Sequence, residues 1–195
     1  MPKFSIIIVT YNAGNKIEES LKSIINQKYI DYEIIVVDGG SDDETIKICN
    51  KYKKYISQIL SENDNGIYDA FNKGIKLANG EYLFFLGAGD VLSNNILFSI
   101  KKFFDTDEPL LIYGDVFLKR SEQIYDGEFD AWKLAKRNIC HQSIFYNKKI
   151  FQIVGLYNLK YKILADWEFN MRCISDRRVK LKYINAVIAI YEEGG

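Results

Sequence analysis

The chain has 195 residues, 48% of them hydrophobic, and its 26 basic and 26 acidic residues cancel. This length supports one well-packed core and is short for two. No Lys/Arg cluster is dense enough to follow a phosphate backbone, so nucleic acid is not an expected partner. No segment approaches the ~20 apolar residues that cross a bilayer, and no leader-like pattern precedes the first strand, so we expect a cytoplasmic protein. Cys49, Cys140 and Cys173 lack metal-ligand spacing and are expected to be reduced packing residues.

The first half of the chain alternates between predicted strands and helices. Continuous apolar runs at 4–9, 32–37, 56–60 and 82–87 predict strands that are buried on both faces. The segments between them carry apolar residues at helical spacing. Strands joined in this way predict an α/β fold in which a mainly parallel sheet has helices on both faces.

Polar residues between these elements predict where the helices begin and end. Asn15 with Glu18 is an N-cap signal for the first helix, and the segment 41–44 has the pattern of a capping box for the second. Asn79 and Gly80 are expected to close the third helix through a left-handed residue.

The second half is less regular, and nothing in it marks a domain boundary. We expect a helix at 96–104 and a short strand at 110–113 that continues as an edge strand over 114–118. The remaining predicted elements are a strand at 141–146, helices at 148–155 and 167–174, and a closing pair of strands at 179–184 and 186–191.

Three carboxylates stand at strand ends or helix starts. Asp38 and Asp90 follow buried strands, and the carboxyl ends of parallel strands share one edge of a sheet, where ligands bind. Asp166 can join them if the second half folds over that edge. A carboxylate at a helix start is also stabilised there by about 0.3–1 kcal/mol without any ligand. This interpretation covers Asp42 and Asp43, and for Asp166 it stands as an alternative to a role in the site. For Asp90, the preceding buried strand favours a ligand-binding role.

Five segments, taken together and in order, resemble a family 2 glycosyltransferase with the GT-A fold. They are SIIIVTYN at 5–12, VVDGGSDD at 36–43, NG at 65–66 with NKG at 72–74, GEYLFFLGAGD at 80–90, and ADWE at 165–168. The likeness is strongest to bacterial exopolysaccharide or colanic-acid-type enzymes. It covers nearly the whole chain and implies one Rossmann-like domain over 1–195, with a nucleotide-binding half at 1–90 and an acceptor-side half at 91–195.

The resemblance implies an inverting transfer of a hexosyl or N-acetylhexosaminyl group from a nucleotide-diphosphate donor, with a UDP-sugar expected. The acceptor would be a hydroxyl of a glycan or lipid-linked molecule in bacterial surface polysaccharide synthesis. Such enzymes often work at a membrane, so peripheral contact stays open, although the sequence shows no strong basic amphipathic helix.

The same resemblance assigns roles to individual residues. Asp90 would hold Mg²⁺ or Mn²⁺, which neutralises the leaving diphosphate, and Asp166 would be the general base for the acceptor hydroxyl. Glu168 lies two residues on, roughly on the other side of a helix, and is assigned as a secondary site residue. His141 and Gly89 are secondary site residues, the glycine because it lets a bulky group approach the backbone. The nucleotide would contact Thr10, Tyr11, Asn12, Asp38, Asp64, Gly66, Asn72 and Lys73.

The chain departs from the family pattern in ways that leave other functions open. Gly87-Ala88-Gly89-Asp90 stands where relatives carry Asp-x-Asp-Asp, and Gly39 replaces a usual acid. The end at 191–195 suggests a truncated or unusually minimal form. A non-catalytic nucleotide-sugar-binding module or an inactive subunit is therefore an alternative. A nucleotidyltransferase would need a glycine-rich basic phosphate loop after the first strand, and residues 10–16 do not resemble one.

Overall fold

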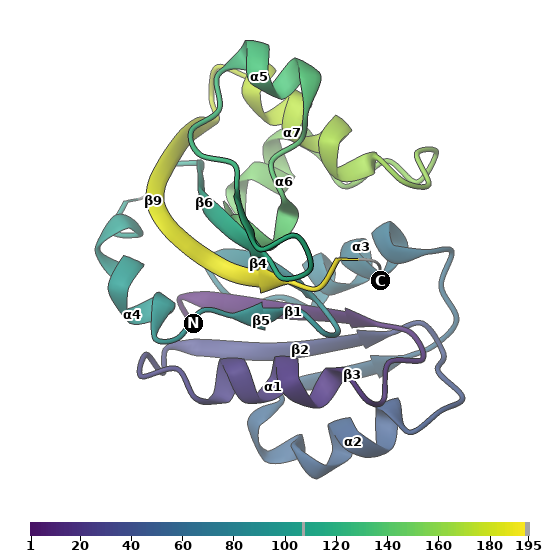
Figure 1. Ribbon diagram of the computed structural model, residues 1–195. Coiled ribbons are helices and arrows are strands. Elements are labelled where there is room, and N and C mark those ends of the chain that lie inside the picture. Colours follow the sequence, from purple (N-terminus) through teal and green to yellow (C-terminus); the bar gives the residue numbers. More distant parts are fainter. Residues whose placement is uncertain (107, 194–195) are drawn as a thin grey trace.

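The computed structural model describes residues 1–106 and 108–193, and this part of the chain folds around one mixed sheet (Figure 1). The sheet order is β3-β2-β1-β4-β8-β6-β9-β5, and β7 pairs with β6. Parallel pairing joins β3, β2, β1 and β4, as the sequence predicts. The strands are β1 (Phe4–Thr10), β2 (Tyr32–Asp38), β3 (Gln58–Ser61), β4 (Tyr82–Gly87), β5 (Val91–Leu92), β6 (Leu110–Leu118), β7 (Gln123–Tyr125), β8 (Ile144–Asn147) and β9 (Lys180–Tyr191).

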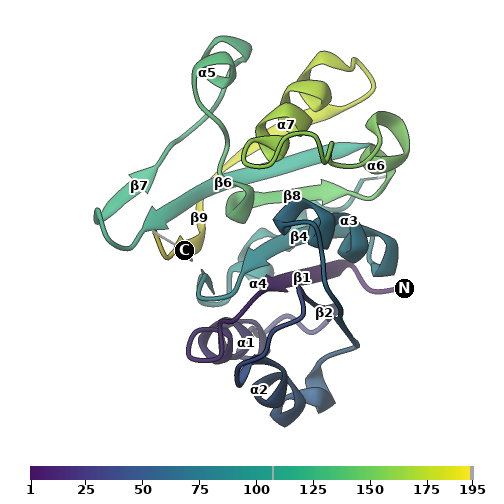
Figure 2. The same cartoon turned by 90° about the vertical axis from the view of Figure 1, so that its right-hand side faces the viewer.

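Helices cover both faces of this sheet, which confirms the predicted α/β class. The first face packs against α1 (Ile17–Ile25), α2 (Thr45–Lys51) and α4 (Ile96–Ile100). The second packs against α3 (Ile67–Leu77), α5 (Ala131–Lys136), α6 (Lys149–Val154) and α7 (Ala165–Ser175). In Figure 2, α1 and α2 lie below the first strands, whereas α3, α6 and α7 lie on the other side. Short 3₁₀ turns are η1 (Lys53–Tyr55), η2 (Lys101–Phe103) and η3 (His141–Ser143).

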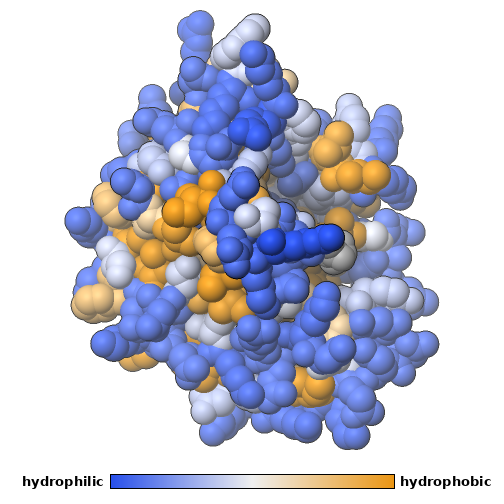
Figure 3. Space-filling model, viewed as in Figure 1, coloured by the Kyte–Doolittle hydropathy of each residue, from blue (hydrophilic) through white to orange (hydrophobic). Residues whose placement is uncertain are grey.

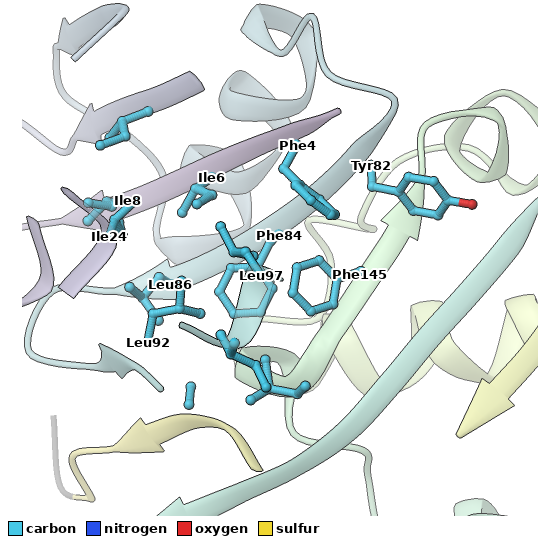
Figure 4. Packing of buried hydrophobic residues seen from close by; sticks show 14 of the residues in the cluster. Phe4, Ile6, Ile8, Ile24, Tyr82, Phe84, Leu86, Leu92, Leu97 and Phe145 are labelled. Carbon is cyan, nitrogen blue, oxygen red and sulfur yellow. The ribbon is translucent and has the colours of Figure 1, made fainter. Parts of the chain in front are cut away.

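Strand β1 shows why the central strands are continuous apolar runs. Phe4, Ile6 and Ile8 point into the core under α1 and α4, as Figure 4 shows, while Ile7 and Val9 point into the core under α3. Successive side chains of a strand alternate between faces, so a strand covered on both sides needs an apolar residue at every position. All seven residues of β1 are buried.

The helix-end predictions were wrong in detail. Helix α1 begins at Ile17 after Lys16, and α2 begins at Thr45 after Glu44, in both cases without a side-chain cap. Asp43 instead accepts hydrogen bonds from the backbone N–H groups of Gly14 and Thr45, at 3.0 and 2.9 Å. The acidic loop before α2 therefore ties the β1–α1 loop to α2.

The end of α3 also differs, because Gly80 does not have a left-handed backbone. The helix ends at Leu77, and the next residue, Ala78, has an extended backbone. A Cβ added at Gly80 would lie 2.5 Å from the backbone nitrogen of Ser5 on β1. The glycine is required for this close approach of two backbones rather than for a helix cap.

The second half contains longer strands than the sequence predicts. The expected edge strand at 114–118 is the continuation of β6, which lies inside the sheet between β8 and β9. The expected closing pair is one strand, β9. The pairing of β6 with β9 shifts register near Gly114, where an added Cβ would lie 2.4 Å from the carbonyl oxygen of Ala186. This bulge lets both strands continue through positions that the sequence pattern marks as breaks. His141 lies in η3, just before β8 rather than in it.

Candidate active site

A cleft of about 710 Å³ opens at the carboxyl ends of β1 and β4. Its walls come from the β1–α1 loop, the start of α3, the segment after β4, the turn η3 and the end of β9. In Figure 1, the C-terminal end of the described chain lies at this same edge of the sheet. The lining residues that carry the discussion below are Thr10, Tyr11, Asn12, Lys16, Asp64, Gly66, Asp90, His141, Gln142 and Glu192.

Asp90 lies in this cleft and is 4% exposed. Its Oδ2 accepts hydrogen bonds from the backbone N–H of Gly87 at 3.1 Å and from Gln142 Nε2 at 2.9 Å. Its Oδ1 accepts one from the backbone N–H of Glu192 at 3.0 Å. Burial raises the pKa of Asp90, and the Gln142 and Glu192 hydrogen bonds oppose that shift. The carboxylate is thus fixed by three elements, with one hydrogen bond on Oδ1.

The residues around Asp90 fit a cation held largely by its substrate. Gly87 and Gly89 contribute no side chain, and the described residues contain no group of three or more His, Cys, Asp or Glu that could hold a metal. Asp90 can offer one carboxylate oxygen. Mg²⁺ is commonly bound in this way, by one or two carboxylates together with phosphate oxygens and water.

Asp166 lies in the first turn of α7 and is 8% exposed. It accepts hydrogen bonds from the hydroxyl of Tyr68 and from Nδ2 of Asn138, both at 2.8 Å. The Nδ1 atom of His141 lies 3.6 Å from its Oδ2. Burial alone would raise the pKa of Asp166, but His141 and Tyr68 hold it below its ordinary value. His141 lines the cleft, whereas Asp166 does not line it and lies next to the imidazole. Glu168 instead forms an ion pair with Arg172 at 2.7 Å.

Five of the eight predicted nucleotide-binding residues line the cleft: Thr10, Tyr11, Asn12, Asp64 and Gly66. The ring of Tyr11 is exposed there. Asp64 lies beside Gly39, because a Cβ added at Gly39 would be 2.7 Å from its Oδ2. The Asp64 carboxylate therefore takes part of the space that the usual acid at position 39 would fill.

The other three, Asp38, Asn72 and Lys73, bond within the protein and do not line the cleft. Asp38 is 1% exposed, and its carboxylate accepts hydrogen bonds from the loop that follows β2. The amide of Asn72 exchanges two hydrogen bonds with the backbone of Tyr157, at 2.9 and 3.0 Å. The ammonium of Lys73 pairs with Glu62 at 2.9 Å. Their geometry supports a role in shaping the site rather than in touching a nucleotide.

Four residues around the site were not predicted from the sequence. Lys16 follows the 5–12 segment, and Gln142 follows the single histidine, so both had a positional signal. Asn138 had none, because it reaches Asp166 from the turn after α5. Glu192 contacts Asp90 through its backbone N–H, which no residue type reveals.

Comparisons with known proteins agree with this architecture. Residues 5–165 match the profile of Glycosyl transferase family 2. A PGL/p-HBAD biosynthesis glycosyltransferase of Mycobacterium tuberculosis is 43% identical over 200 residues, which cover 100% of this chain and 78% of that protein. The poly(ribitol-phosphate) beta-N-acetylglucosaminyltransferase TarP of Staphylococcus aureus is 30% identical, covering 85% of this chain and 54% of TarP. These names do not single out the exopolysaccharide or colanic-acid branch that the sequence suggested.

Solved structures show the same fold. S. aureus TarS 1-349 in complex with UDP-GlcNAc superposes with a TM-score of 0.84 at 20% identity, covering 99% of this chain and 59% of the TarS chain. The mannosyltransferase PcManGT of Pyrobaculum calidifontis, in complex with GDP-Man and Mn²⁺, gives 0.75 at 19% identity, covering 97% and 56%. The chain thus spans about 60% of the TarS 1-349 chain. Because the family profile covers most of this chain and a 43% identical relative covers all of it, the chain belongs to glycosyl transferase family 2.

Proposed function

We propose that this protein transfers a sugar from a UDP-sugar to a hydroxyl of a cell-surface glycan or of a lipid-linked acceptor, with inversion at the anomeric carbon. One observation carries the proposal: a single cleft contains Asp90, just after β4, and His141 of η3, whose imidazole lies next to Asp166 at the start of α7. The relatives named for PGL/p-HBAD and poly(ribitol-phosphate) glycosylation, and the TarS complex with UDP-GlcNAc, support the substrate classes.

The donor would lie along the β1 and β4 side of the cleft. The exposed ring of Tyr11 offers a surface for base stacking, and the Asp64 carboxylate can accept hydrogen bonds from base or ribose. Asp90, together with the donor diphosphate, would hold Mg²⁺ or Mn²⁺. Such a cation would supply charge neutralisation for the leaving diphosphate.

The acceptor hydroxyl would approach from the His141 side. It attacks the anomeric carbon opposite the leaving group, so the new glycosidic bond forms as the bond to the diphosphate breaks and configuration inverts. The hydroxyl proton passes to the Asp166 carboxylate, whose lowered pKa keeps it ionised and able to accept. Hydrogen bonds from Tyr68 and Asn138 hold that carboxylate in one orientation.

The segment between α6 and α7 supports an acceptor with an apolar part and contact with a membrane surface. Ile163 is 80% exposed, and Leu164 and Tyr161 are about half exposed. Figure 3 shows an apolar patch on the right of the molecule, where Figure 1 draws the segment between α6 and α7. Lys160 and Lys162 alternate with them, an arrangement suited to anionic lipid headgroups. Within the described residues, no helix is both long and apolar enough to span a membrane. Co-sedimentation with phosphatidylglycerol vesicles tests the contact, and Ile163→Ser should weaken it.

The decisive test of the activity compares wild type with Asp166→Asn. We expect wild type to release UDP and form glycoside, and the variant to lose transfer while still binding UDP. Glu168→Gln is the matched control, because it removes a carboxylate two residues away that pairs with Arg172. UDP binding without product from wild type would favour the binding-module alternative, and release of pyrophosphate would indicate a nucleotidyltransferase. Lost UDP binding in folded Asp166→Asn would show that its role is misassigned.

A further inference from the structure

Lys16 is a cleft residue that the proposed reaction has not yet used. It immediately precedes α1, and its side chain is exposed at the cleft. Its Cδ, Cβ and Cγ atoms lie 3.2, 3.5 and 3.8 Å from the position of a Cβ added at Gly89. The aliphatic part of the lysine therefore runs along the backbone of Gly89, next to Asp90.

The ammonium group of Lys16 has no carboxylate partner among the described residues. Glu192 is the nearby acid, since the charge of Lys16 helps to lower its pKa, but the Glu192 carboxylate pairs with Lys119 at 2.7 Å. By contrast, Lys22 on α1 pairs with Glu18 at 3.0 Å. Among the described residues that line the cleft, Lys16 is also the single lysine or arginine. An unpaired cation in a cleft of this kind is available to an anionic ligand.

The backbone of Gly89 explains why the lysine can lie there. Gly89 has a φ of +107°, a conformation that residues with side chains rarely adopt. An acidic side chain at this position, as in Asp-x-Asp-Asp, would be strained and would meet the Lys16 stem. In this chain, a glycine and a lysine stand where a second carboxylate would be, so the wall beside Asp90 gains a positive charge and lacks a negative one.

We propose that Lys16 binds the diphosphate of the donor and supplies part of the charge neutralisation otherwise left to a divalent cation. This inference rests on the proposed function, since it requires a nucleoside-diphosphate ligand. It predicts that nucleoside diphosphate binds this protein measurably without any divalent cation, through Lys16. The lysine acts on the phosphate groups alone and leaves recognition of the nucleoside to the β1 side of the cleft.

Calorimetric titration of UDP and uridine, in EDTA and in Mg²⁺, tests this role. Lys16→Gln should weaken UDP binding in EDTA about ten-fold or more, the change expected from one charge-assisted hydrogen bond, and leave uridine binding unchanged. Lys16→Arg should restore most of the UDP affinity. Lys22→Gln is the matched control and should behave as wild type. The Tm of Lys16→Gln and of Lys22→Gln should equal that of wild type, because both lysine side chains are exposed.

The outcomes separate this inference from the proposed function. Equal UDP affinity of wild type and Lys16→Gln in EDTA would overturn the role of Lys16 and leave the proposed function standing. An equal loss of uridine and UDP affinity would also overturn it, because Lys16 would then support the nucleoside side of the cleft. If UDP, GDP, dTDP and CDP all fail to bind wild type with and without Mg²⁺, the proposed function fails and the inference fails with it.

Discussion

Replacing Asp38 with alanine distinguishes a structural carboxylate from one that contacts the nucleotide. The resemblance assigned Asp38 to the nucleotide, but the structure buries it. Oδ2 accepts hydrogen bonds from the backbone N–H groups of Gly40 and Ser41, at 3.1 and 2.9 Å, and from the Ser61 hydroxyl at 2.7 Å. The Ser41 hydroxyl donates to Oδ1 and accepts a hydrogen bond from the backbone N–H of Asn12 at 2.8 Å. Asp38 thereby holds the loop after β2, whose Ser41 positions the cleft residue Asn12.

The expected cost follows from these four contacts. A hydrogen bond to a charged group contributes about 1.5–3 kcal/mol, and such contributions are not additive within one network. We therefore expect Asp38→Ala to lower the free energy of unfolding by about 3–5 kcal/mol, and Ser61→Ala, which removes one contact, by about 1.5–3 kcal/mol. For a chain of this length, the larger loss corresponds to a fall in Tm of about 6–20 °C.

Urea unfolding followed by circular dichroism measures these losses, and titration with UDP below the unfolding transition measures binding. We expect UDP affinity to fall only a few-fold in Asp38→Ala, as the loop before α2 loosens, and to be unchanged in Ser61→Ala. A variant Asp38→Ala with wild-type stability and no detectable UDP binding would refute the structural reading and return Asp38 to the nucleotide site.

Two further predictions concern the buried carboxylates in the cleft and next to it, Asp90 and Asp166. Burial raises the pKa of Asp90, so its ionisation lowers the free energy of unfolding as the pH rises through that pKa. Asp90→Asn should therefore be at least as stable as wild type at pH 7, and this difference should vanish in acid. In the same variant, Mg²⁺-dependent UDP binding should fall at least ten-fold. Thermal melts at pH 7 and pH 4 check the sign, and a destabilised variant at pH 7 would contradict it. The pKa of Asp166 is lowered, so its ionised form stabilises the fold above the ordinary value of 3.8 and this contribution is lost in stronger acid. Wild type should accordingly lose its stability advantage over Asp166→Asn as the pH falls from 5 to 2, and an advantage that grows in that range would argue against it.

The sheet of the first half was predictable because each strand is a local pattern. Strand β1 is apolar at nearly every position, and its neighbours β2 and β4 repeat this pattern, so burial on both faces follows without knowledge of the pairing. The second half was less predictable because its pairing is not local. Whether Gly114 breaks β6 or forms a bulge depends on Ala186, 72 positions away, whose carbonyl it approaches.

The candidate site likewise combines features with a local sequence signal and features that depend on non-local contacts. Its strand-end carboxylate, Asp90, was predicted because a charge after a buried strand is a local signal. Its surroundings were not, because Gln142 reaches Asp90 from η3 and Glu192 reaches it from just after β9. The sequence placed Asp166 in the base position by motif, but its partners Asn138 and Tyr68 come from two other elements. Motifs thus identified the two carboxylates, whereas their hydrogen-bond partners depend on tertiary contacts that the sequence does not show.

The two departures from the family pattern have the same physical form. At Gly39, the space next to the backbone is taken by the Asp64 carboxylate from the loop before α3. At Gly89, it is taken by the Lys16 stem from the start of α1. In the first case the Asp64 carboxylate lies next to position 39, so under the proposed function the nucleoside side of the cleft would keep an acceptor group. In the second case the sign of the charge changes beside Asp90. Donor recognition should therefore follow the family at the nucleoside and differ from it at the diphosphate, and the comparison of uridine with UDP in EDTA separates these two contributions.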